Sequence, residues 1–266
     1  MVGTKPSVMP TPAVFAAFGA AGTPERMAGG RGLTWRSGQI VVRPIEDPEE
    51  AAWKSQVLAV IDSSEGFTVP RPIRDDRGNW VHDGWQATEW IPGVADETRV
   101  GDIVGAGEAF HRAIAGLPRP SFIAASNDPW SQADRIAWGE ATLPADELLE
   151  LLVAECRLVN APSQVIHGDL LGNVLFAEGR PPAVIDWAPY WRPPGLGAAI
   201  AVVDAACWHG HSLDALADNH GIPQWRQLLL RALVFRMTTL HLFGYWDDAQ
   251  ADRHKPVAAA IATLTE

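Results

Sequence analysis

The 266-residue sequence predicts an α+β protein in two parts, a strand-rich first third and a mostly helical remainder. Up to about residue 93, short apolar runs alternate with glycine and aspartate turns, a pattern typical of antiparallel strands. From residue 98 onward, apolar residues recur at helical spacing, and a Pro92-Gly93 pair marks the boundary. We therefore expect a small antiparallel sheet in residues 1–93 and a larger helical part in 94–266, forming two lobes with a cleft between them.

Turn residues and apolar runs place the individual elements. We expect strands at 25–28, 33–36, 40–43, 67–69, 80–81 and 86–91. A helix is expected after Asp47-Pro48, because Glu49 and Glu50 then supply an acidic first turn. The apolar stretch 13–22 is short and bounded by prolines, so it is expected to be a helix rather than a signal peptide.

The second part is predicted to contain most of the helix. The expected helices are 98–116, 128–140, 145–158, 199–219, 223–246 and 249–264. Between the third and the fourth, residues 163–192 have the pattern strand, loop, strand, loop.

Charge and cysteine content exclude several classes of partner. The chain has 32 acidic and 21 basic residues and a net charge of −11, which disfavours binding to nucleic acid or to an anionic membrane. No apolar run is long enough to span a bilayer. Cys156 and Cys207 have no metal-binding or redox spacing, so we expect them to be reduced in a cytoplasmic protein. The sequence leaves the oligomeric state open.

Chemistry-bearing residues gather in 164–187, QVIHGDLLGNVLFAEGRPPAVIDW. An apolar strand leads to Asp169, Asn173 precedes the next strand, and Asp186 follows the third. Phosphoryl transfer needs oxygen ligands for divalent cations and a carboxylate that orients the acceptor hydroxyl and takes its proton. The alternative to a phosphoryl-transfer site is a hairpin whose acidic side chains simply cap turns.

This segment resembles the catalytic core of the aminoglycoside-phosphotransferase family, in which an HGDxxxxN loop precedes IDW or IDF. The resemblance, closest to a bacterial branch, implies a bilobal protein-kinase-like fold that uses ATP and Mg²⁺. It implies that Asp169 is the catalytic base, that His167 supports the loop, and that Asn173 and Asp186 bind metal, Asp186 corresponding to the DFG aspartate of protein kinases. Only three residues separate Asp169 from Asn173 here. We therefore expect the loop (within 165–176) to tighten at Gly172 or to present Asn173 differently.

Residues 29–45, GGRGLTWRSGQIVVRPI, resemble the family's glycine turn and the strand that follows it. Glycines let backbone N–H groups approach phosphates, and a cation neutralises them. The resemblance assigns these roles to Gly29, Gly30, Gly32 and Arg43. A plain hairpin with a solvated arginine is the alternative.

Kinases pair that basic residue with a glutamate on a helix. The corresponding positions here, near Lys54 and Gln56, are not acidic. Glu50, one turn earlier, is the best substitute, although a solvated helix start explains it equally well.

Residues 86–93, QATEWIPG, resemble the last strand and hinge of the family's first lobe. The backbone around Glu89, Trp90 and Ile91 would then hydrogen-bond adenine. Phe110-His111-Arg112 resembles a helix motif of the family, in which His111 is expected to pack structurally.

The segment after Asp186 is where the resemblance places acceptor contacts. The side chains of Trp187, Tyr190 and Trp191 could stack on a planar or sugar-like molecule, and Arg192 could meet a negative group. A packed loop cover is the alternative. Asp204 matches a later family aspartate and is expected to brace the catalytic loop.

The predicted function is an ATP-dependent kinase that phosphorylates a hydroxyl of a small molecule. The alternative is a degenerate kinase-like protein that binds nucleotide or a partner without turnover, which the shortened loop and the missing helix glutamate suggest. A serine hydrolase is excluded because the sequence has no Gly-x-Ser-x-Gly elbow.

Overall fold

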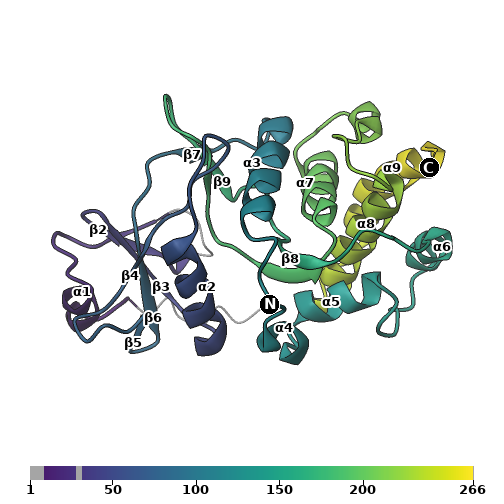
Figure 1. Ribbon diagram of the computed structural model, residues 1–266. Coiled ribbons are helices and arrows are strands. Elements are labelled where there is room, and N and C mark those ends of the chain that lie inside the picture. Colours follow the sequence, from purple (N-terminus) through teal and green to yellow (C-terminus); the bar gives the residue numbers. More distant parts are fainter. Residues whose placement is uncertain (1–8, 28–31, 266) are drawn as a thin grey trace. The chain divides into compact units, whose positions relative to one another are not determined.

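The protein is described by a computed structural model covering residues 9–27 and 32–265 (Figure 1). These residues divide into two compact units. The first contains the described residues up to Gly93 together with Phe176–Asp186, and the second contains Val94–Leu175 and the described residues from Trp187 onward. The sequence placed all of 94–266 in one part, so the return of 176–186 to the first unit differs from that expectation.

The first unit is built on an antiparallel sheet in the order β1-β2-β3-β6-β4, with β5 also paired to β6. Its strands are β1 (Glu25–Arg26), β2 (Trp35–Ser37), β3 (Ile40–Pro44), β4 (Pro72–Ile73), β5 (Val81–His82) and β6 (Trp85–Glu89). The tight β2–β3 turn contains Gly38 at φ +60, a backbone conformation that glycine adopts without steric cost. The β3–β6 register places Arg43 opposite Gln86.

Helices α1 and α2 belong to this unit. The side chains of α1 (Pro12–Ala17) pack with Val42 and Ala87 of the sheet in a small apolar core. Helix α2 (Pro48–Val60) begins as predicted, because the Asp47 side chain accepts hydrogen bonds from the backbone N–H groups of Glu49 and Glu50.

Backbone hydrogen bonds explain why 176–186 joins the first unit. The N–H of Thr68 donates to the Pro182 carbonyl at 2.8 Å, and the N–H of Val184 donates to the Thr68 carbonyl at 2.9 Å. In place of the strand that we expected at 67–69, Phe67 and Thr68 form isolated bridges with Ser64 and Ala183. The turn-forming segment 177–182 joins β9 (Val174–Phe176) to β10 (Ala183–Val184).

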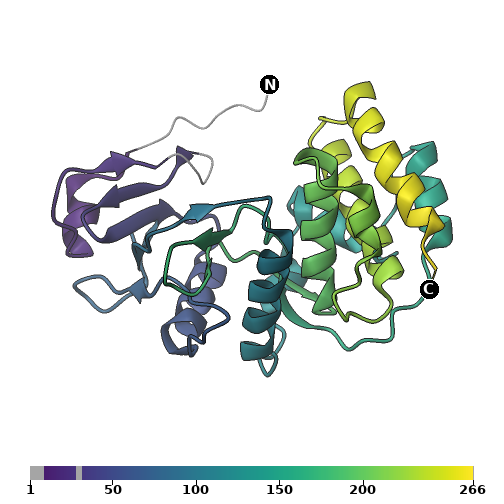
Figure 2. The same cartoon turned by 90° about the horizontal axis from the view of Figure 1, so that it is seen from above.

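Helices dominate the second unit. They are α3 (Val100–Ala113), α4 (Ser121–Ala125), α5 (Pro129–Ala137), α6 (Glu147–Glu155), α7 (Gly195–Trp208), α8 (Trp225–Leu242) and α9 (Asp248–Thr263). The predicted helix 199–219 is α7 followed by a separate 3-10 turn, η2 (Leu213–Ala217), and the short α4 was not predicted. Helices α7, α8 and α9 pack side by side around a core that includes Ile200, Leu233 and Ile261 (Figures 1 and 2).

The second unit also contains strands β7 (Val94–Ala95), β8 (Gln164–His167) and β11 (Pro189–Arg192), together with the first two residues of β9. Strand β11 runs antiparallel to β8, with Pro189 opposite His167 and Arg192 opposite Gln164. Sequence reasoning had treated 187–192 as a loop, so β11 is a difference. Proline at its first position is compatible with a strand because no ladder N–H is needed there.

Among the described residues, no helix combines the length and apolar character needed to cross a bilayer. Cys156 and Cys207 are both free thiols.

Candidate functional site

The loop that follows β8 is a tight, hydrogen-bonded turn. The Asp169 N–H donates to Nδ1 of His167 at 3.1 Å, so His167 supports the loop as expected. The Asn173 N–H donates to the Leu170 carbonyl at 2.9 Å, and Gly172 has φ +79, a backbone conformation at this turn position that favours glycine. Of the two possibilities for the shortened loop, the structure has the one that tightens at Gly172.

The Asn173 side chain folds back onto Asp169. Its Nδ2 donates to the Asp169 carbonyl at 2.8 Å and to Asp169 Oδ2 at 3.2 Å. The amide oxygen of Asn173 takes no part in these bonds. It is the kind of hard oxygen ligand that Mg²⁺ prefers, so the side chain fits the metal role despite the shorter loop.

Sequence reasoning missed the residue that holds the other carboxylate oxygen of Asp169. Arg236, in α8, donates through Nη2 to Asp169 Oδ1 at 2.7 Å and through Nε to Asp204 Oδ1 at 2.8 Å. Nη2 also contacts Asp204 Oδ2. The Asp204 carboxylate is buried, which raises its pKa against the opposing effect of Arg236. An arginine inside the apolar run LVFRM was the available signal, because a buried charge requires a partner.

His111, in α3, lies behind the loop. Its Nε2 accepts the N–H of His167 at 2.8 Å, and its ring also hydrogen-bonds the Pro194 backbone. Burial, reinforced by His167, outweighs these hydrogen bonds and lowers the pKa of His111 to about 3. The side chain is therefore a neutral packing element, as expected.

In the first unit, Arg43 and Asp186 form an ion pair between Nη1 and Oδ1. Gln86, with its amide oxygen turned toward the guanidinium, accepts from Nε and Nη2 of Arg43. Asp186 itself has φ +48, a left-handed conformation that aspartate tolerates better than most residues. Its side chain is 39% exposed, which leaves carboxylate oxygen accessible as a metal ligand.

Glu50 is not the partner of Arg43. The Glu50 carboxylate instead pairs with Lys54, one helical turn along α2, at 2.6 Å. Burial lowers the pKa of Lys54, and Glu50 opposes that shift. The Arg43–Glu50 hypothesis is therefore wrong, because the i, i+4 geometry of α2 satisfies Glu50 locally.

The glycine turn is only partly described. Gly29 and Gly30 lie outside the described residues. Gly32 has φ +68, and its carbonyl accepts a hydrogen bond from Nε of Arg26 at 2.6 Å.

In the hinge segment expected to hydrogen-bond adenine, two of the three backbone N–H groups already have partners within the protein. The N–H of Glu89 donates to the Arg71 carbonyl and that of Trp90 donates to the Gln39 carbonyl, each at 2.8 Å. These two backbone donors belong to the sheet. Of the three hinge positions, Ile91 is the one whose N–H has no backbone acceptor among the described residues.

Residues 33–190 match the sequence model of the phosphotransferase enzyme family. The chain belongs to this family. No curated protein matches it. Several solved aminoglycoside phosphotransferases share its protein-kinase-like fold over nearly the whole length.

An aminoglycoside phosphotransferase from Alicyclobacillus acidocaldarius has a TM-score of 0.61 at 15% identity, covering 98% of each chain. A thermostable APH(4)-Ia mutant in complex with ADP and hygromycin B has a TM-score of 0.57 at 16% identity, covering 95% of this chain and 98% of that one. AMP-bound spectinomycin phosphotransferase APH(9)-Ia has a TM-score of 0.58 at 12% identity, covering 96% and 97%. At such identities the likeness establishes the fold alone.

Two of the side chains expected to contact the acceptor, Trp187 and Arg192, make contacts within the protein instead. Trp187 is 3% exposed, donates through Nε1 to the Ile166 carbonyl at 3.1 Å, and packs edge-on against Phe110. Arg192 bonds both oxygens of Asp134 and both oxygens of Glu140 at 2.7–3.1 Å. The assignment of these two side chains to the acceptor is corrected, because burial and ion pairing engage both.

The remaining aromatic residues of this segment lie on β11. The Tyr190 ring packs against Phe235, and a Cβ built at Gly168 would lie 2.4 Å from it. Trp191 is half-buried. Together with Trp187 and Arg192, these contacts favour the packed alternative for 187–192.

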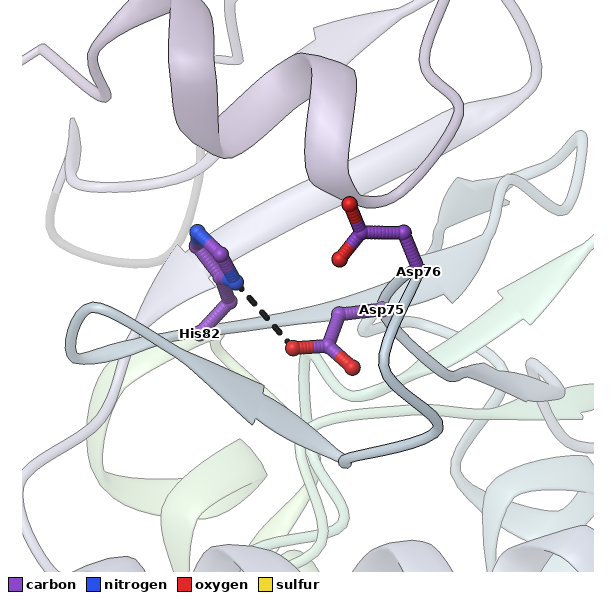
Figure 3. A group of neighbouring side chains, drawn as sticks. All are labelled: Asp75, Asp76 and His82. Atoms are coloured by element: carbon purple, nitrogen blue, oxygen red, sulfur yellow. Dashed lines mark hydrogen bonds and ion pairs between the residues drawn. The ribbon is translucent and has the colours of Figure 1, made fainter.

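One cluster elsewhere in the first unit resembles a metal site, namely Asp75, Asp76 and His82 (Figure 3). The Asp75 carboxylate accepts hydrogen bonds from His82 Nδ1 and from the Asn79 and Arg77 backbones at 2.7–3.1 Å. Burial would raise the pKa of Asp75, but these hydrogen bonds outweigh it and lower the pKa to about 2. Hydrogen bonding within the turn thus explains the positions of Asp75 and His82.

Proposed function

We propose that this phosphotransferase-family protein transfers the γ-phosphoryl group of ATP to a hydroxyl of a small molecule. The observation that carries the proposal is the arrangement of Asp169. Its carboxylate is 45% exposed at the end of a short, ordered turn, with Oδ1 held by Arg236 and Oδ2 approached by Asn173. A fixed, accessible carboxylate can orient an acceptor hydroxyl and take its proton during transfer.

The other site residues divide the work of binding ATP·Mg²⁺. In this proposal the Asn173 amide oxygen and the Asp186 carboxylate hold Mg²⁺, which neutralises phosphate charge when bound. Arg43 contacts the phosphates, because its planar guanidinium matches their geometry. The glycine turn, including Gly32, offers backbone N–H groups, and the Ile91 N–H contacts adenine.

The acceptor is proposed only as a class. Solved relatives of the fold bind hygromycin B and spectinomycin. A hydroxyl-bearing small molecule is the common chemistry. With Trp187 and Arg192 engaged internally, we propose that acceptor contacts come from other residues near Asp169.

The experiment is ADP formation from ATP·Mg²⁺ across a panel of aminoglycosides, sugars, choline and amino alcohols. Asp169→Asn keeps the shape of the side chain but removes the basic carboxylate, so we expect turnover to fall at least about 100-fold. Asp102→Asn, an exposed carboxylate on α3, is the matched control and should retain activity. Equal activity of Asp169→Asn and the wild type would refute the assignment of the base.

A second candidate, nucleotide binding without turnover, is favoured by one observation. α2 supplies Lys54 where kinases supply an acid, and Arg43 is paired with Asp186 instead. This candidate predicts tight ATP·Mg²⁺ binding by calorimetry together with no acceptor-dependent ADP formation on the whole panel.

A further inference from the structure

Arg236 carries a charge into the middle of a buried helix. Its neighbours on α8, including Leu233 and Met237, belong to the apolar core. The Arg236 side chain is only 13% exposed. Removing a guanidinium from water is costly unless its hydrogen bonds are made, so a residue at this position requires strong partners.

If Arg236 only joined α8 to α7, the Asp204 carboxylate would be a sufficient partner for its buried charge. It is 9% exposed and accepts from both Nε and Nη2 of Arg236. Burial lowers the pKa of Arg236, but the charges of Asp204 and Asp169 outweigh it and raise the pKa above its ordinary value, so the group is cationic. The bond to Asp169 is a second use of the same guanidinium. This hydrogen bond connects the packed helices α7 and α8 to Asp169, a half-exposed residue of the loop.

We propose that Arg236 is a positioning residue that fixes the Asp169 carboxylate for phosphoryl transfer. Asp204 orients the guanidinium, the guanidinium holds Oδ1, and Oδ2 is left toward Asn173 and the acceptor. The inference rests on the proposed function, since it assigns a role in the same reaction. It also changes the expected role of Asp204, which braces the loop through Arg236.

Loss of this contact should act on kcat rather than on ATP binding. A misdirected carboxylate fails to align the hydroxyl in the transition state, and small errors of placement cost up to about 100-fold in rate. Arg236 donates to residues of the loop and of α7, so the KM for ATP should change by less than about threefold. Lysine retains the charge but cannot bridge both carboxylates in a fork, so Arg236→Lys should recover only part of kcat.

The decisive variant must fold. Arg236→Gln alone strands the buried Asp204 charge, so the test uses the double variant Asp204→Asn/Arg236→Gln, which removes both charges together. The matched control is Arg231→Gln, a buried arginine of α8 that donates to the Ala137 and Arg157 carbonyls. All variants are assayed below their melting temperatures. We expect kcat to fall about tenfold or more in the double variant, and by less than about twofold in the control.

A measurement without turnover separates this inference from the proposed function. Amide hydrogen exchange of peptides covering 167–174, in the absence of nucleotide, should be about tenfold faster in the double variant and near wild type in Arg231→Gln. If the wild type phosphorylates nothing yet the loop exchange rises in this way, the proposed function fails, while the structural part of the inference, that Arg236 fixes the loop around Asp169, stands. Unchanged exchange and unchanged kcat in the double variant overturn the role. So does an equal loss in the Arg231 control, which would indicate general loosening of α8.

Discussion

Arg43 and Asp186 are ion-paired although 143 positions separate them in the chain. Strand β3 supplies the arginine, and the bend after β10 supplies the aspartate at a positive φ. Both lie in the first unit, because Thr68 draws 182–184 into its hydrogen bonding. The group proposed to bind phosphate is thus paired with the group proposed to bind metal.

Replacing Arg43 should weaken ATP·Mg²⁺ binding. A hydrogen bond to a charged group contributes about 1.5–3 kcal/mol, so Arg43→Met should raise the Kd by about 10- to 100-fold, and Arg43→Lys by less. Calorimetric titration measures the affinity. Arg74→Met is the control, because Arg74 stacks on Trp80 and bonds the Gly78 carbonyl in a turn of the same unit. An unaltered Kd in Arg43→Met would show that the ion pair is only structural.

His111 should make stability depend on pH. The unfolded chain takes up a proton near pH 6.5, whereas the folded protein keeps this buried ring neutral down to about pH 3. The unfolded state therefore binds more protons between these values, and stability falls as the pH drops through the window, by on the order of 4 kcal/mol. In His111→Gln, urea unfolding between pH 7 and 4 should show a smaller loss. His209→Gln, at an exposed histidine, is the control and should leave the wild-type profile intact, and equal profiles for all three proteins would contradict the assignment.

Arg192 should contribute to stability and not to acceptor binding. Asp134 is 12% exposed, and burial raises its pKa against the effect of Arg192. Arg192→Met strands this carboxylate and should lower the free energy of unfolding by about 3–5 kcal/mol. Adding Asp134→Asn should restore part of it, because the unpaired charge is then gone. A stable Arg192→Met protein with a raised KM for the acceptor would return this residue to the substrate site.

Two glycine substitutions should change stability in opposite directions. A Cβ at Gly197 in α7 would lie 2.6 Å from the His167 carbonyl oxygen, so Gly197→Ala should destabilise the protein and disturb the catalytic loop. A Cβ at Gly105 in α3 meets nothing within 4 Å, so Gly105→Ala should stabilise the helix by about 0.5–1 kcal/mol. Thermal unfolding of both variants measures the difference. Equal melting temperatures would show that α7 can move away from β8.

Local patterns in the sequence predicted what depends on neighbouring residues. The Asp47 cap of α2 and most of the strands and helices follow from turn and capping chemistry within a few positions. For the loop after Asp169, the sequence offered tightening at Gly172 as one of two possibilities, and the structure has that one. The resemblance of residues 164–187 to the catalytic core of aminoglycoside phosphotransferases also predicted the phosphotransferase family, which the family model confirms.

Contacts between distant residues lay beyond these patterns. That β11 pairs with β8, that Arg192 meets Asp134, and that Arg236 joins Asp204 to Asp169 depend on which faces pack together. A charged side chain has the same sequence signature whether solvent or another helix surrounds it. Burial decides its role, because only in the interior must each charge find its partner, and only the tertiary structure sets burial.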